Sequence, residues 1–124
     1  MVLVSEHHPL AAHTTVSPAD LHGESLILPS RRRARSAAAS WLGGYFDESR
    51  IVGTCNLPIN AAAMVAAGLG VCLCIDTGAA YDGVRPLALT PPIETGSIIV
   101  WKKQATPSSA AAAFIRFLGE RDRT

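Results

Sequence analysis

The chain has 124 residues, a length at which a single domain with one hydrophobic core can fold. Hydrophobic residues make up 48% of the sequence and charged residues 17%, which excludes the polar, highly charged class of disordered proteins. Eleven Lys and Arg residues against ten Asp and Glu residues give a net charge of +1, so this segment alone has no overall field to attract nucleic acid or an anionic membrane.

The first residues of the chain predict a strand and then a short helix. Residues 2–4, Val-Leu-Val, form an apolar run typical of a buried strand. A loop is expected over 7–15. The Ser-Pro pair that opens residues 17–21 supplies a cap and a first helical residue, so we expect a short helix there that ends before Gly23.

The middle of the chain predicts strands that alternate with helices. Residues 25–28 predict a second buried strand, and the alanine-rich stretch 33–42 predicts a helix. The pattern then repeats with a strand over 51–55, a proline-led helix over 57–67 and a strand over 71–75. A strand, a helix and a strand in so short a space imply a parallel crossover connection.

The last third of the chain predicts two further strands and a closing helix. A strand is expected over 84–89, after which two prolines prevent a central strand from continuing. Residues 98–102 predict another strand, and 106–118 predict a helix with apolar residues at helical spacing. The alternation indicates a layered α/β fold with a mostly parallel sheet, and such folds bind ligands at the carboxyl ends of parallel strands.

The sequence predicts a cytoplasmic protein. No apolar run approaches the roughly 20 residues needed to cross a bilayer, and residues 1–9 lack the basic-then-apolar order of an export signal. Cys55, Cys72 and Cys74 are an odd set in a mostly apolar context, which suits a reducing compartment better than a disulfide framework.

Two of the cysteines invite a functional interpretation. Cys72 and Cys74 are two residues apart on a predicted strand, so their side chains project to the same face and could bind a soft metal ion or respond to oxidants. No His or Cys partner stands at a recognisable metal spacing. We therefore expect buried apolar packing for this pair, and no metal ion or cofactor.

Nothing in the sequence predicts catalysis. The four histidines precede Gly23, with no Ser or Cys nucleophile motif or carboxylate pair beside them. The Gly68-Leu69-Gly70 turn follows a predicted helix and precedes a strand, the reverse of the order in a dinucleotide-binding loop. We expect no catalytic residues and a protein that is not an enzyme.

Four segments, in this order, resemble the effector domain of LysR-type transcriptional regulators. They are His8-Pro9-Leu10-Ala11, then Asp20-Leu21-His22-Gly23 leading into Leu26-Ile27-Leu28, then Met64-Val65-Ala66-Ala67-Gly68-Leu69-Gly70-Val71, then Trp101-Lys102-Lys103 with residues 108–118. Each segment alone is weak evidence. Their order and spacing span nearly the whole chain, and that combination is specific enough to identify the family.

The resemblance implies a three-layer α/β fold like that of periplasmic type 2 binding proteins, in which two crossing strands join two subdomains around an effector. On this basis residues 8–90 are the second subdomain. Residues 2–5 and 91–119 then supply the crossing strands and the last strand and helix of a truncated first subdomain, while the winged helix-turn-helix and linker helix are missing. One departure is Asp76, where the family more often has proline.

The resemblance also implies a function. We expect a ligand-sensing domain that binds a small anionic metabolite and so controls DNA binding by its parent protein, with DNA contacted only through the missing N-terminal domain. We expect self-association as a homodimer or larger oligomer, because uncovered sheet edges and apolar faces remain, and no membrane partner. The alternative is a fragment of a solute-binding protein for transport, which would need an export signal or lipid anchor.

Two strand-to-helix turns are the candidate effector-binding sites, because unpaired N–H groups at a helix N-terminus hold a small anion well. The candidate residues are Ser30, Arg31 and Arg32 in the first turn, and Thr54, Cys55 and Asn56 in the second. The second turn, by resemblance, lies where the family's second subdomain faces the effector. The alternatives are that the arginines lie on a solvated loop and that Asn56 only caps the next helix.

Overall fold

The computed structural model describes residues 1–122, which fall into two units, one over residues 1–94 and one that starts at residue 95. The first unit contains six strands and two α-helices, joined by short 3₁₀ turns. These elements are β1 (Val2–Ser5), β2 (Thr15–Val16), β3 (Leu26–Pro29), α1 (Arg32–Leu42), β4 (Ile51–Cys55), α2 (Pro58–Ala66), β5 (Val71–Leu73) and β6 (Val84–Leu89).

The six strands form one sheet in the order β2-β6-β1-β5-β3-β4. Strand β1 runs antiparallel to both of its neighbours, whereas β3 is parallel to β4 and β5, and β2 is parallel to β6. The predicted mostly parallel sheet is therefore confirmed, with β1 as its one reversed strand. Strand β4 lies at one edge, paired only with β3.

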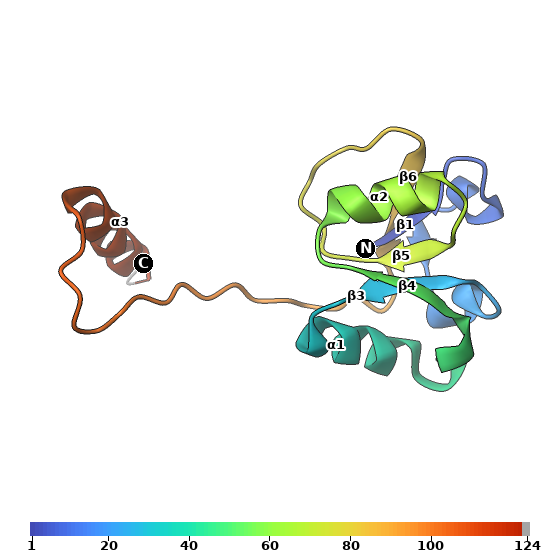
Figure 1. Ribbon diagram of the computed structural model, residues 1–124, viewed down its shortest axis with the longest axis horizontal. Helices are drawn as coiled ribbons and strands as arrows, with labels where there is room; N and C mark the ends of the chain where they lie inside the picture. The colour runs from blue at the N-terminus through green and yellow to red at the C-terminus, as the bar shows by residue number, and fades with distance from the viewer. Residues whose placement is uncertain (123–124) are drawn as a thin grey trace. The chain divides into compact units, whose positions relative to one another are not determined.

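Helices α1 and α2 cover opposite faces of this sheet, which gives three layers (Figure 1). Ala38 and Leu42 of α1 pack in the core that lies on one side of the sheet. Ala61 and Val65 of α2 pack in the core on the other side. Side chains from alternate positions of the strands enter the two cores, because successive residues of a strand point to opposite faces. The predicted three-layer α/β architecture is confirmed.

Local structure follows the sequence closely in this unit. The predicted short helix is a 3₁₀ turn over Pro18–Leu21, and the two predicted crossover helices are present as α1 and α2. The predicted loop over 7–15 contains a second 3₁₀ turn, Pro9–Ala12, where the Nδ1 atom of His8 accepts a hydrogen bond from the amide of Leu10 over 3.0 Å. Strand β5 is shorter than predicted.

The second unit is described by residues 95–122 and contains one helix, α3 (Ser109–Arg121), which the sequence predicted. The hydroxyl of Ser108 caps it by accepting a hydrogen bond from the amide of Ala111 over 3.3 Å. The predicted strand over 98–102 is wrong, since this stretch is irregular. A strand forms by pairing with another strand, and residues 95–122 supply no partner for it. Of the strand and helix expected here, only the helix is present.

Candidate functional site

A hollow of about 230 Å³ opens in the first unit where β3, β4 and β5 end. These three strands are parallel neighbours, so their carboxyl ends meet at one edge of the sheet. Arg31 and Asn56 are the polar side chains of its wall, and most of the remaining wall is apolar. The position is the one that α/β folds commonly use for ligands.

The two predicted turns lie side by side at this edge. The last pair of the β3–β4 ladder joins Pro29 to Cys55, and the amide of Ser30 then donates a hydrogen bond to the carbonyl of Cys55 over 2.8 Å. One turn leads into α1 and the other into α2. The backbone thus fixes the starts of both helices beside a single hollow.

Three of the six predicted residues line the hollow, namely Arg31, Cys55 and Asn56. The other three, Ser30, Arg32 and Thr54, are exposed neighbours in the same two turns and are not part of the lining. Ligand binding by all six residues stays a prediction. The geometry favours the first three for direct contact.

The helix starts beside the hollow lack side-chain caps. Arg31 is the N-cap residue of α1 and Leu57 that of α2, and neither side chain accepts a hydrogen bond there. Asn56 is therefore not the cap of α2, which removes the structural explanation considered for it. The first-turn N–H groups of α1 have no side-chain acceptor among residues 1–122, and their partial positive charge favours a nearby anion.

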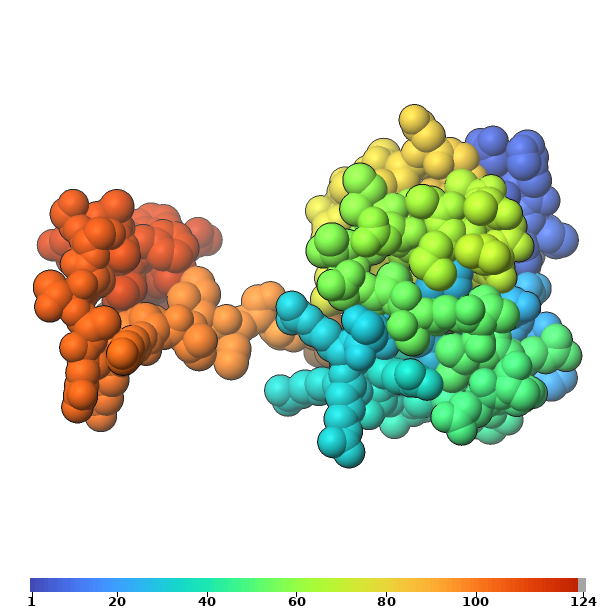
Figure 2. All heavy atoms as spheres, viewed as in Figure 1, coloured from blue at the N-terminus to red at the C-terminus, as the bar shows by residue number. Residues whose placement is uncertain are grey.

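Arginine side chains add to this positive potential. Arg31, Arg32 and Arg33 are exposed at the start of α1. In Figure 2 long side chains of the cyan segment, which includes the start of α1, extend from the surface next to the green segment that includes α2. The local charge at this edge is thus positive, although the net charge of the chain is only +1.

Six lining residues of the hollow were not predicted from the sequence. Four of them flank the two predicted turns, namely Pro29, Ala34, Leu57 and Pro58, and the other two come from a third strand. Cys74 and Ile75 follow β5 and complete the wall because β5 pairs with the other side of β3. The signal that could have found them is the predicted strand over 71–75, since the ends of parallel strands share an edge. The sequence did not show that β5 lies beside β3 in the sheet, and this neighbourhood is what places the end of β5 at the hollow.

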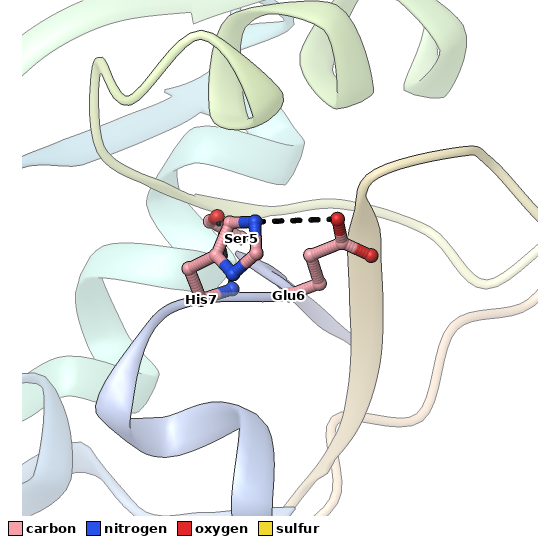
Figure 3. Close-up of polar contacts among 3 residues, drawn as sticks. All are labelled: Ser5, Glu6 and His7. Carbon is pink, nitrogen blue, oxygen red and sulfur yellow. Dashed lines mark hydrogen bonds and ion pairs between the residues drawn. The ribbon is translucent and has the colours of Figure 1, made fainter.

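The histidines lie outside the hollow. The Nε2 atom of His7 is 3.4 Å from Oε1 of Glu6, and the amide of His7 donates to the Ser5 hydroxyl over 3.2 Å (Figure 3). The His7 side chain is 88% exposed, so this contact contributes little to stability. The Nε2 atom of His8 lies 3.2 Å from Oε2 of Glu24. Neither arrangement presents a nucleophile or a carboxylate pair.

Comparison with known proteins assigns the chain to a family. The family model that describes the LysR substrate binding domain matches residues 1–123. The chain belongs to the LysR substrate-binding domain family. This match confirms the family that the four ordered segments indicated, and with it the effector-binding domain of a LysR-type transcriptional regulator.

Solved structures of LysR-family proteins share this fold. The LysR family regulator HinK from Pseudomonas aeruginosa superposes with a TM-score of 0.74 at 25% identity, over 97% of this chain and 43% of HinK. The C-terminal domain of a probable LysR family transcriptional regulator from Rhodococcus sp. RHA1 gives a TM-score of 0.66 at 28% identity, over 96% of this chain and 62% of that domain. The chain thus spans less than two thirds of each of these relatives.

A third solved structure, the BenM effector binding domain with its effector benzoate, shares the fold at a TM-score of 0.61 and 23% identity. The match covers 72% of this chain and 43% of the BenM domain.

Within residues 1–122, no helix combines the length and apolarity that a transmembrane span requires.

Proposed function

We propose that this chain is the ligand-sensing module of its parent regulator and that the hollow binds a small organic anion with an apolar body. The observation that carries the proposal is the hollow itself, in which one arginine and an uncapped helix start stand beside a largely apolar wall. The positive end of α1 and Arg31 hold the anionic group, and Asn56 donates or accepts a further hydrogen bond.

The chemistry of the wall favours an anion over a cation. No Asp or Glu is among the residues that line the hollow, so nothing there repels a carboxylate. Leu57 and Ile75 are about half exposed, at 52% and 59%, and their burial under a ligand stabilises the apolar part of the complex. The apolar wall and a charge-assisted hydrogen bond from Arg31 together favour a small organic anion with an apolar body.

The size of the hollow bears on how the ligand is enclosed. Its volume of about 230 Å³ is below the range of about 300–1,000 Å³ that is usual for ligand pockets. We therefore assign it one wall of the binding cleft, with the other wall contributed by polypeptide of the first subdomain. The BenM domain holds benzoate, an apolar ring with a carboxylate, which is a ligand of the proposed class.

The proposed output is regulatory rather than catalytic. A ligand that binds the closed form of two subdomains more tightly than the open form shifts the population of the parent protein, and with it DNA binding through the N-terminal domain. The match to LysR-type domains favours this role over solute transport.

Self-association is part of the proposal. In the second unit several large apolar side chains are exposed, including Ile98 at 86%, Val100 at 79% and Phe114 at 52%. Patches of this kind mark protein interfaces when they are contiguous. A second copy of the chain is the partner that we assign to them.

The test is a titration of the chain with matched pairs of small molecules. Benzoate, salicylate and phenylacetate are each compared with the neutral primary amide of the same acid by thermal unfolding and NMR. The acids are expected to raise the melting temperature and to shift the amide resonances of residues 30–34 and 55–57. The proposal is wrong if none of these acids acts, or if the amides act equally well.

A further inference from the structure

Trp41 joins helix α1 to the segment that follows β6. Its indole Nε1–H donates a hydrogen bond to the carbonyl oxygen of Pro91 over 2.6 Å, across 50 positions of the sequence. The bond is short for an N–H donor and a carbonyl acceptor. The ring packs against the core on the α1 side of the sheet, where Leu89 of β6 also packs. Packing therefore holds the ring of Trp41, and Pro91 holds its nitrogen.

The chain leaves the first unit directly after this bond. Strand β6 ends at Leu89, and the amide of Thr90 donates to the carbonyl of Val16 in β2 over 2.8 Å, which ties the chain to the sheet up to that point. Within residues 1–122, the bond from Trp41 is the only hydrogen bond made by residues 91–94, where the first unit ends. Trp41 thus supplies the last hydrogen-bonded anchor of the chain before the second unit.

Two consecutive prolines make this anchor effective. The ring of Pro91 and that of Pro92 each fix the φ angle, and a residue that precedes proline is confined to extended conformations. A stiff dipeptide passes on the direction that is set at its first residue, whereas a flexible one would lose that direction. The direction in which the chain leaves the first unit is therefore set at Pro91, where Trp41 holds it.

Core packing alone does not require this hydrogen bond. Phe46 and Ile51 pack against the same core as Trp41 and carry no polar side-chain atom. A tryptophan that is partly buried usually finds a partner for its N–H group. Here that partner belongs to the leaving segment and not to a helix or a strand of the first unit.

Helix α1 connects this anchor to the hollow. Arg31, which lines the hollow, is the N-cap residue of α1, and Trp41 lies in the last turn of the same helix. The two residues are about 15 Å apart along the helix axis at the usual rise per residue. A helix of this length moves as one rigid element, because its backbone hydrogen bonds are internal. A ligand that displaces the start of α1 therefore also displaces Trp41.

We propose that Trp41 is a positioning residue for the ligand response, which couples occupancy of the hollow to residues 91–94 through α1. The bond from its indole to Pro91 stabilises the placement of α1 that binds the anion. By linkage, an anion at Arg31 stabilises the hold on the leaving segment to the same extent. This coupling rests on the proposed function, because it needs a ligand in the hollow.

The first experiment follows the indole N–H groups of the two tryptophans by NMR while benzoate, salicylate and phenylacetate are titrated. Trp101 is 60% exposed in an irregular stretch and is the internal reference, and Trp101→Phe assigns the two resonances. In the free chain the Trp41 indole is expected to exchange its proton at least about tenfold more slowly than that of Trp101. An acid that binds should slow this exchange further and shift the Trp41 resonance, with Trp101 unchanged. Binding without any change at Trp41 overturns the coupling.

The second experiment removes the indole N–H group in Trp41→Phe, which keeps an aromatic ring for the core. The dissociation constant for benzoate is expected to rise about two- to tenfold, the effect that loss of one hydrogen bond has on an equilibrium constant. The amides of Ile93 and Glu94 are expected to gain fast motion, measured as a lower heteronuclear NOE. Trp101→Phe, the same substitution in the second unit, is the control and should behave as wild type.

A purely structural role of Trp41 gives a different result. Trp41→Phe would then lower the melting temperature, while the dissociation constant and the motion of residues 93–94 keep their wild-type values, and this outcome overturns the proposal. Circular dichroism shows whether the variant is folded at the temperature of the titration. The indole measurements on the wild-type chain need no variant, and they decide the case if Trp41→Phe does not fold.

Failure of the proposed function is distinguishable from failure of the coupling. If no acid changes any resonance of the wild-type chain, the proposed function fails and the coupling fails with it. If the acids shift residues 30–34 and 55–57 but leave the Trp41 indole and residues 93–94 unchanged, the hollow binds anions and the coupling alone is overturned.

Discussion

The amide of Ser30 donates a hydrogen bond to the carbonyl of Cys55 over 2.8 Å, which joins the turn before α1 to the turn before α2. This bond extends the β3–β4 ladder by one step beyond the last strand pair. The two helices start on opposite faces of the sheet, yet their first turns are held at one edge. The hollow depends on this link, because its wall is drawn from both turns.

Loss of this link is expected to disturb the hollow. Ser30→Pro removes the amide donor and leaves the Cys55 carbonyl without its partner, at a cost of about 1–3 kcal/mol in the free energy of unfolding. Anion affinity is expected to fall as well. Ser30→Ala keeps the amide and removes only the hydroxyl, which is not part of the lining, so its affinity and urea midpoint should match wild type. Equal behaviour of the two variants would refute the importance of the amide.

Arg31 is expected to supply a direct contact to the anionic group. Arg31→Gln should weaken binding of an organic acid by about tenfold or more, since a hydrogen bond to a charged group contributes about 1.5–3 kcal/mol. Arg33→Gln is the matched control, because Arg33 is exposed on the same helix and does not line the hollow. Isothermal titration of both variants checks this, and a loss of equal size in the control would show that only general charge matters.

The sequence predicted the local structure of this site well, because each part of it has a local cause. Proline at the start of α2 and the apolar runs of β3 and β4 mark their elements without reference to the rest of the chain. The two turns could therefore be named from sequence. Three of their residues, Arg31, Cys55 and Asn56, do line the hollow.

What the sequence could not supply is the order of the strands. Cys74 belongs to the wall only because β5 lies beside β3, and Cys55 touches Cys72 for the same reason. The strand expected over 98–102 failed for a related cause. Its composition favours a strand, but a strand needs a neighbour, and pairing is a property of the whole fold.

Gly70 is expected to be required by a close backbone approach. A Cβ atom at this position would collide with the carbonyl oxygen of Ser25, which is itself held by a hydrogen bond from the amide of Val71 over 2.9 Å. Gly70→Ala should therefore lower the free energy of unfolding by about 1–3 kcal/mol. Gly44→Ala, where no atom lies within 4 Å of the added Cβ, should change it by less than about 0.5 kcal/mol. Urea unfolding of the two variants measures both free energies of unfolding, and an equal change in the two would contradict the close approach at Gly70.

Self-association is expected to depend on the apolar segment of the second unit. The double variant Ile98→Ser with Val100→Ser removes two exposed side chains from an irregular stretch, so no helix or strand is disturbed. Its dimer dissociation constant should rise by at least about tenfold, given about 1.5–3 kcal/mol for each side chain buried. Leu69→Ser, a half-exposed position of the first unit, is the control. A wild-type chain that sediments as a monomer at micromolar concentration contradicts the interface.

Asp20 gives the stability of the chain a defined dependence on pH. Its carboxylate accepts hydrogen bonds from the amide of Ser17 over 2.8 Å and from the hydroxyl of Ser17 over 2.9 Å, and these bonds, the amide first, hold the pKa of Asp20 below its usual value of 3.8. A carboxylate whose pKa is lowered in the folded state stabilises the fold above its unfolded pKa. That contribution is lost as the pH falls through the folded pKa.

Asp20→Asn should therefore be less stable than wild type at neutral pH, and the difference should shrink once the pH falls below 3.8. The effect is modest, because the carboxylate is exposed and screened by solvent. Asp82→Asn serves as the control, since Asp82 is an exposed carboxylate without a hydrogen-bond partner among residues 1–122. Thermal unfolding of the three proteins across the acid range measures the effect, and a difference between wild type and Asp20→Asn that stays constant with pH would assign it to packing instead of charge.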